Sequence, residues 1–145
     1  MVTDKATTKG SCLCGESTYS FTGQPAATGT CHCLSCRKLT GTTSATCFLV
    51  PRPNFEFTPN APIKTVTVTH EVGISMTISF CSNCGSPMCK EADTEEFRGL
   101  AIVFAGTVDN ADALLEQPPN MELWTKYRLP YVAPIKTAKQ CEQFA

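Results

Sequence analysis

Valines alternate with threonines between residues 63 and 69, and apolar side chains occupy every second position between residues 74 and 80. A period of two is typical of a β-strand that buries one face. A short segment near residues 71–73, which contains Gly73, separates the two runs. The pattern therefore predicts a β-hairpin over residues 63–80.

Four other segments have the pattern of strands, and only two short segments have the composition of helices. The predicted strands are 17–23 (STYSFTG), 42–50 (TTSATCFLV), 54–58 (NFEFT) and 100–108 (LAIVFAGTV), and the predicted helical turns are 36–41 (CRKLTG) and 110–117 (NADALLEQ). Prolines on both sides of residues 54–58 predict an edge strand. The unbroken apolar run at residues 100–108 predicts a central strand covered on both faces. The fold class is therefore mainly β, with short helical turns.

The length of the chain indicates one domain, and its charge argues against nucleic acids and anionic membranes as partners. The chain has 145 residues, enough for one domain with a hydrophobic core, and its formal net charge is −1 with no run of four like charges. Nucleic acids and anionic membranes require a concentrated positive face, so we expect neither as a partner. The polar N-terminus MVTDKATTKG has no secretory apolar segment, and no apolar run is long enough to cross a bilayer, so we expect a cytoplasmic protein.

The cysteines are concentrated in three short motifs, SCLCG, TCHCLSC and FCSNCG. Cytosolic thiols seldom form lasting disulfides, and cysteines at such close spacing suit the chelation of one metal ion. The thiols of the motifs are Cys12 and Cys14; Cys31, Cys33 and Cys36; and Cys81 and Cys84. A closed structural zinc site takes four nitrogen or sulfur ligands, so these thiols complete one such site and leave three.

Two partitions agree with this count. In the first, the first and third motifs form a closed site, and the middle motif holds a metal with a vacant fourth position, as in a catalytic zinc site. In the second, the CxxC units at 33–36 and 81–84 form a zinc ribbon and leave Cys12, Cys14 and Cys31. We favour the first because three thiols on one short loop are already arranged to hold a metal.

The remaining histidines and cysteines have simpler interpretations. His32 lies between two proposed ligands, so its side chain is expected to point away from the metal that they share. His70 lies at the tip of the predicted hairpin, where we expect it to be solvated. Cys47 is expected to be a core thiol of its strand, and Cys89 a partly buried, inert thiol. Cys141 has no evident partner in the sequence.

The ordered motifs GSCLCGESTYSF, CHCLSCRKLTG, FCSNCGSPM, AGTVD and ELWTKYRLPYV resemble the glutathione-dependent formaldehyde-activating enzyme family, whose domain also occurs in centromere protein V. The resemblance implies an antiparallel zinc-binding fold called the β-tent. It divides the chain into a polar leader at 1–9, the zinc domain at 10–136 and a C-terminal tail at 137–145. It also implies two Zn²⁺ ions per chain. The implied ligands are Cys12, Cys14, Cys81 and Cys84 for a structural zinc, and Cys31, Cys33 and Cys36 for a catalytic zinc.

The same resemblance implies a zinc-dependent carbon–sulfur lyase. Such an enzyme forms or cleaves a carbon–sulfur bond of a glutathione adduct, for instance S-(hydroxymethyl)glutathione or a larger conjugate. Glutathione would be its co-substrate, and the two carboxylates of glutathione require cations, for which Arg37 and Lys38 are the nearest candidates. The alternative hypothesis is a non-catalytic zinc-stabilised binding or protein-interaction module. That alternative requires a middle motif that is metal-free or closed by a fourth protein ligand such as His32 or Cys89.

Overall fold

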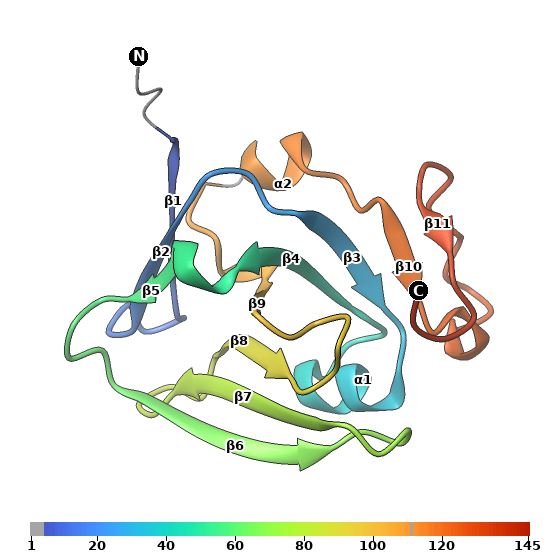
Figure 1. The fold of residues 1–145 in the computed structure, drawn as a ribbon, viewed down its shortest axis with the longest axis horizontal. Coiled ribbons are helices and arrows are strands. Elements are labelled where there is room, and N and C mark those ends of the chain that lie inside the picture. The colour runs from blue at the N-terminus through green and yellow to red at the C-terminus, as the bar shows by residue number, and fades with distance from the viewer. Residues whose placement is uncertain (1–4, 111) are drawn as a thin grey trace.

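The computed structural model describes residues 5–110 and 112–145, which form two β-sheets and short helices. The smaller sheet is antiparallel and has three strands in the order β1-β2-β5. Its strands are β1 (Thr7–Ser11), β2 (Thr18–Thr22) and β5 (Phe55–Phe57). In Figure 1 this sheet lies to one side of the larger sheet, close to the N-terminal end. Strand β1 was not predicted, because its sequence TTKGS is polar throughout.

The larger sheet has eight strands in the order β11-β10-β3-β4-β9-β8-β7-β6. Its strands along the chain are β3 (Ala27–Cys31), β4 (Ala45–Pro51), β6 (Ile63–Thr69), β7 (Ser75–Cys81), β8 (Pro87–Ala92), β9 (Leu100–Phe104), β10 (Met121–Leu123) and β11 (Lys139–Gln140). Neighbouring strands are antiparallel except at β3–β10 and β10–β11, which are parallel. The predicted mainly β class and its hairpin, β6 with β7, are confirmed.

Strand β9 lies inside the larger sheet and is buried on both faces, as its apolar sequence predicted. It ends earlier than predicted, because residues Ala105–Thr107 form a 3₁₀ helix, η2. The predicted helical turns are present as α1 (Leu34–Thr40) and α2 (Asp112–Glu116), and Ala111 lies outside the described residues. Two further 3₁₀ turns are η1 (Arg52–Asn54) and η3 (Thr125–Tyr127).

The larger sheet separates two hydrophobic cores. Successive residues of β4 face opposite cores: Phe48 and Val50 pack in one, and Cys47 and Leu49 pack in the other. This alternation follows from the two-residue period of a strand. The first core is closed by aromatic residues of the smaller sheet, Tyr19, Phe21 and Phe55. The second is closed by α1 and by C-terminal residues, including Trp124 and Cys141.

Each core adjoins one of the cysteine groups. Cys12 and Cys81 belong to the first core, whereas Cys33 and Cys36 belong to the second. The fold therefore holds the two predicted metal sites on opposite sides of the larger sheet. None of the helices among the described residues combines the length and the hydrophobicity that crossing a membrane would require.

Candidate metal centres

The first and third cysteine motifs meet in a four-cysteine cluster, formed by Cys12, Cys14, Cys81 and Cys84. All four Sγ atoms lie within 4.8 Å of one another. Cys12 and Cys14 Sγ are 3.5 Å apart, and Cys14 and Cys81 Sγ are 3.9 Å apart. Sulfur atoms at tetrahedral positions 2.3 Å from one zinc ion would have similar separations. This donor set therefore fits a closed metal site.

Two tight turns carry the four-cysteine cluster. Gly85 follows Cys84 at a φ of +79°, and its N–H donates to the Cys81 carbonyl at 2.8 Å. A side chain at that φ would be strained, so the CxxCG sequence favours this turn. Two N–H donors point at the sulfurs: Ser17 N lies 3.2 Å from Cys12 Sγ, and Asn83 Nδ2 lies 3.3 Å from Cys14 Sγ. Such donors stabilise thiolates.

The middle motif forms a three-cysteine cluster, Cys31, Cys33 and Cys36, whose Sγ atoms also lie within 4.8 Å of one another. Cys31 ends β3, and Cys33 is the N-cap residue of α1, where its Sγ accepts from the Cys36 N–H at 3.3 Å. A strand end and the first helical turn thus gather three thiols within six residues. Neither His32 nor Cys89 belongs to this group of donors.

A buried lysine borders the three-cysteine cluster, and the sequence did not reveal it. Lys90 is only 7 % exposed, and its Nζ donates to Cys36 Sγ at 3.2 Å. The thiols of Cys31 and Cys33, together with the Lys90 ammonium, hold the pKa of Cys36 far below its usual range. Burial acts to lower the pKa of Lys90, but the facing thiolates, chiefly Cys36, outweigh burial and raise it. The cluster therefore has its own counter-charge.

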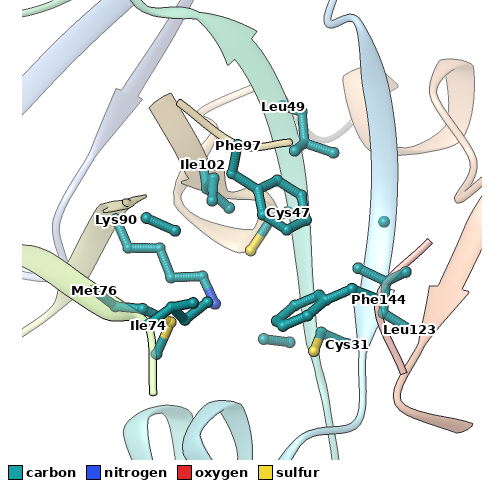
Figure 2. A pocket seen from close by; sticks show the side chains of 13 residues that line it. Cys31, Cys47, Leu49, Ile74, Met76, Lys90, Phe97, Ile102, Leu123 and Phe144 are labelled. Carbon is teal, nitrogen blue, oxygen red and sulfur yellow. The ribbon is translucent and has the colours of Figure 1, made fainter. Parts of the chain in front are cut away.

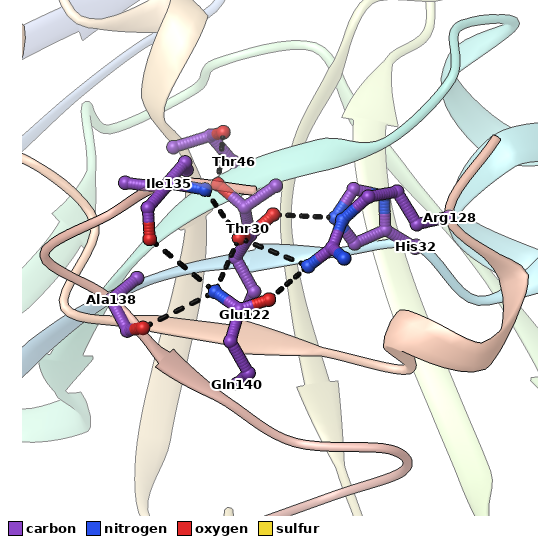
Figure 3. A network of polar contacts seen from close by, with 8 residues as sticks. All are labelled: Thr30, His32, Thr46, Glu122, Arg128, Ile135, Ala138 and Gln140. Carbon is purple, nitrogen blue, oxygen red and sulfur yellow. Dashed lines mark hydrogen bonds and ion pairs between the residues drawn. The ribbon is translucent and has the colours of Figure 1, made fainter. Parts of the chain in front are cut away.

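His32 is not among the donors of the three-cysteine cluster, as predicted, and it joins a buried polar network (Figure 3). Its Nε2 lies 2.8 Å from Glu122 Oε1, and both side chains are 1 % exposed. Glu122 Oε2 accepts from Arg128 Nη2 at 3.1 Å, from Ile135 N at 2.8 Å and from Gln140 Nε2 at 2.6 Å. The network ties the loop between two ligands to the C-terminal segment.

Burial acts to raise the pKa of the Glu122 carboxyl. Hydrogen bonds from Gln140, His32 and the Ile135 N–H, with the charge of Arg128, outweigh it and hold that pKa below its ordinary value. Glu122 therefore remains a carboxylate in the folded protein. Its position gave no signal in the sequence, because a single glutamate within ELWTKYRLPYV does not differ from a surface residue.

An apolar cavity opens beside the three-cysteine cluster (Figure 2). Lys90 reaches into it from β8, and Cys31 forms part of its wall. The other lining residues are apolar except for a cysteine: Gly29, Ala45, Cys47, Leu49, Ile74, Met76, Ala92, Phe97, Ile102, Leu123 and Phe144. The cavity has a volume of about 50 Å³, which is room for a short alkyl group but not for an aromatic ring, since a cavity that binds benzene measures about 150 Å³.

The two cations predicted to bind glutathione, Arg37 and Lys38, are less buried than Lys90. Lys38 is exposed on α1 and lines a second groove, together with Cys36 and Lys90, between α1 and the β6–β7 hairpin. Arg37 is partly buried and lines neither of these two hollows. The structure therefore brings Lys38 to the edge of the cluster and leaves Arg37 outside both hollows.

Two expectations about other side chains have different outcomes. His70 is only 2 % exposed, so the expectation that it is solvated was wrong. Its ring packs against Trp124 and Phe144, with ring centroids 5.0 Å and 5.3 Å apart, because the C-terminal segment folds back over the hairpin tip. Cys47 is buried in β4, as predicted, and burial raises the pKa of its thiol to about 12.

Comparison with known proteins agrees with this fold. The crystal structure of a Rhodobacter sphaeroides protein superposes with a TM-score of 0.55 at 17 % identity, over 76 % of this chain and 97 % of the other. At that identity the likeness shows the fold alone. None of the curated proteins matches this chain. A sequence profile described as glutathione-dependent formaldehyde-activating enzyme matches residues 7–127 and so covers both cysteine clusters, and the chain belongs to that family.

Proposed function

We propose that this protein is a zinc-dependent carbon–sulfur lyase that makes or breaks the bond between the glutathione sulfur and a carbonyl-derived carbon. One observation carries the proposal: the three-cysteine cluster adjoins a cavity and a buried cation that reaches into it, whereas the four-cysteine cluster supplies four donors of its own. Three protein ligands with a free position are typical of catalytic zinc sites. Family membership supports glutathione as the thiol.

The donor sets support zinc in both clusters. Thiolate sulfurs are ligands that zinc prefers, and no carboxylate belongs to either group. We assign the structural ion to Cys12, Cys14, Cys81 and Cys84, and the catalytic ion to Cys31, Cys33 and Cys36. When bound, the catalytic zinc supplies a Lewis acid that lowers the pKa of a thiol ligand, which makes the nucleophilic thiolate available at neutral pH.

The protein's own residues prepare the site for an anionic sulfur. Lys90 offsets part of the negative charge of three thiolates, so the cluster can accept a further thiolate at a smaller electrostatic cost. Glu122 and its partners hold His32, and thereby fix the loop that carries Cys31 and Cys33. The second groove, with Lys38 at its rim, is the place that we assign to the peptide part of glutathione. Lys38 would then pair with one of its carboxylates.

Metal quantification on Cys33→Ser tests the proposal most directly. Serine is a good helix N-cap, so this variant keeps the cap of α1 while it removes one ligand of the catalytic zinc. We expect about two zinc ions per wild-type chain and about one in the variant, with the fold retained and glutathione-dependent exchange lost. The matched control is Cys141→Ser, a buried thiol outside both clusters, which keeps both ions and the activity.

Two results would contradict the proposal. If Cys33→Ser kept wild-type turnover, the three-cysteine cluster would not be catalytic. If wild type bound only one zinc per chain at saturating zinc under reducing conditions, the protein would be a zinc-stabilised binding module. For the glutathione site, Lys38→Ala is expected to raise the KM for glutathione about fivefold, with kcat nearly unchanged, because an exposed ion pair contributes about 1 kcal/mol at most.

A further inference from the structure

The apolar cavity beside Cys31 is larger than the reaction of formaldehyde requires. Formaldehyde has no carbon beyond its carbonyl group, so it leaves the lining side chains of β4, β9 and the C-terminal segment without an occupant. Apolar cavities of this kind are poorly hydrated and take up compact apolar molecules. The shape of the site therefore points to a carbon substrate with an apolar group.

The cavity is also unsuited to glutathione itself. Each of its two carboxylates would lose water and would need a partner, because burying an unpaired charge is costly. Among the lining residues Lys90 is the one cation, and its Nζ already lies 3.2 Å from Cys36 Sγ. The peptide must therefore lie outside the cavity, and the group inside it must come from the other reactant.

Cys31 connects the cavity to the reacting sulfur. It is partly buried, belongs to the three-cysteine cluster and forms part of the cavity wall, so a group in the cavity lies next to any thiolate held by the cluster. We propose that the carbon substrate is an aldehyde with a short alkyl group, such as a propyl group, and that this group occupies the cavity. This inference rests on the proposed carbon–sulfur lyase activity and extends it to a substrate class.

The reaction balances without an oxidant or a reductant. The glutathione sulfur forms a bond to the carbonyl carbon, and the carbon–oxygen π pair moves to the oxygen. The proton that the thiol released ends on that oxygen, which gives an S-(1-hydroxyalkyl)glutathione. In the reverse direction the carbon–sulfur bond breaks, its electron pair returns to sulfur, and the hydroxyl proton is released as the aldehyde re-forms.

A pair of aldehydes measures the contribution of the cavity. Exchange NMR measures the rate at which each aldehyde interconverts with its glutathione adduct. The dependence of the enzyme-catalysed rate on aldehyde concentration gives the half-saturating concentration. Butanal has two more carbons than acetaldehyde, and each buried methylene strengthens binding about fourfold. We therefore expect half-saturation at about 15-fold lower concentration for butanal. A ratio near one, with formaldehyde exchange still catalysed, overturns the inference alone; no catalysis with any aldehyde overturns the proposed function as well.

Neighbouring residues of β9 supply a matched pair of variants. Ile102 lines the cavity, whereas Val103 packs in the opposite core, and both are buried. Ile102→Ala is expected to reduce this ratio about fivefold, and Val103→Ala to leave it unchanged. An unchanged ratio in Ile102→Ala contradicts the proposal. If either variant fails to fold, Leu49→Ala and Val50→Ala on β4 provide the same comparison.

A binding measurement needs no turnover. Butan-1-ol carries the same propyl group without a carbonyl, and methyl NMR spectra report where it binds. We expect its addition to shift the methyl signals of Ile102 and Leu49 but not those of Val103 and Val50. Shifts confined to the second pair, or no shifts at saturation, would show that the cavity does not take this group.

Discussion

The two cysteine clusters have the same kind of donor, a cysteine sulfur, but differ in the number of donors and in their surroundings. The four-cysteine cluster joins two turns that lie 67 residues apart in the chain, at Cys14 and Cys81, and one of its thiols is exposed. The three-cysteine cluster comes from one loop and the first turn of α1, and it adjoins a buried lysine and a cavity. One arrangement links distant segments of the chain, whereas the other leaves room for a ligand in the role that we propose.

This difference teaches that ligand number and surroundings decide the role of a thiolate metal site. A fourth protein sulfur completes the coordination of the metal, and the free energy of metal binding then stabilises the folded state. A missing fourth sulfur costs folding energy but leaves a coordination position, which is useful only where a counter-charge and a cavity are present. Lys90 and the apolar lining meet those conditions on one side of the sheet alone.

The largest expected effect distinguishes the two clusters by stability. We expect Cys84→Ser to unfold the domain, because structural zinc binding contributes about 10–16 kcal/mol, which matches or exceeds the whole stability of a typical domain. Cys33→Ser should remain folded under the same conditions. Circular dichroism melting with metal quantification checks both variants. A folded Cys84→Ser that retains about two zinc ions would remove the distinction.

A smaller effect is expected from Glu122→Gln, which weakens the support of the three-cysteine loop. Removing the charge from this buried, multiply bonded carboxylate should cost about 3 kcal/mol. Glu91→Gln is the matched control, because the ion pair of Glu91 with Arg52 is half exposed and contributes little. Denaturant unfolding of both variants measures the difference. Equal free energies of unfolding would show that the buried network has no structural role.

The pH dependence of the same pair sharpens this result. The pKa of Glu122 is lower in the folded protein than its ordinary value, so Glu122 contributes stability above the unfolded pKa, and this contribution is lost as the pH falls through the folded pKa. The difference in unfolding free energy between wild type and Glu122→Gln should therefore shrink from about pH 5 to about pH 3. Metal loss at low pH affects both proteins, so only their difference is interpreted. A constant difference contradicts the assignment.

Replacing the buried cation should affect one metal site only. Lys90→Met keeps the length of the side chain and removes the charge beside Cys36. We expect zinc affinity at the three-cysteine cluster to fall about 10–100-fold, a usual result of losing an outer-sphere partner, with the four-cysteine cluster unaffected. Competition with a chromogenic chelator resolves the two affinities. Lys64→Met is the control, because Lys64 is an exposed lysine on β6. An unchanged zinc affinity at the three-cysteine cluster of Lys90→Met would refute the role of the charge.

The smallest expected effect concerns the turn that carries the four-cysteine cluster. Gly85→Ala should cost about 1 kcal/mol, because alanine is strained at a positive φ even though the space around it is open. Gly106→Ala is the control, since Gly106 has equally open surroundings without a positive φ. Thermal melts compare the two. A neutral Gly85→Ala would mean that the turn relaxes without loss.

Regular patterns in the sequence predicted much of the sheet. The hairpin of β6 and β7, the central strand β9 and the helical turn α1 follow from periodicity and composition. Strands β1, β3 and β8 were not predicted, because they mix polar with small residues and show no regular alternation. Pairing with neighbours, and not intrinsic propensity, makes these segments extended.

Lys90 shows why one part of the site could not be predicted. The pairing of β8 with β7 shifts register between Ser79 and Phe80, so the simple alternation of faces along β8 is interrupted. Met88 and Cys89 both pack in the first core, and Lys90 reaches the second. A lysine is normally exposed, and this one is buried because β8 is an inner strand between two cores.

The sequence by itself determined the donors: three cysteine motifs whose number and spacing allow one closed metal site and one open one, on a mainly β scaffold. It left open which motifs combine, because ligand pairing across a long chain depends on strand order and not on local spacing. The tertiary structure decided that pairing, and it also placed a charged lysine, a buried glutamate and an apolar cavity beside the open site. Those features come from distant strands, and only the packed sheet brings them together.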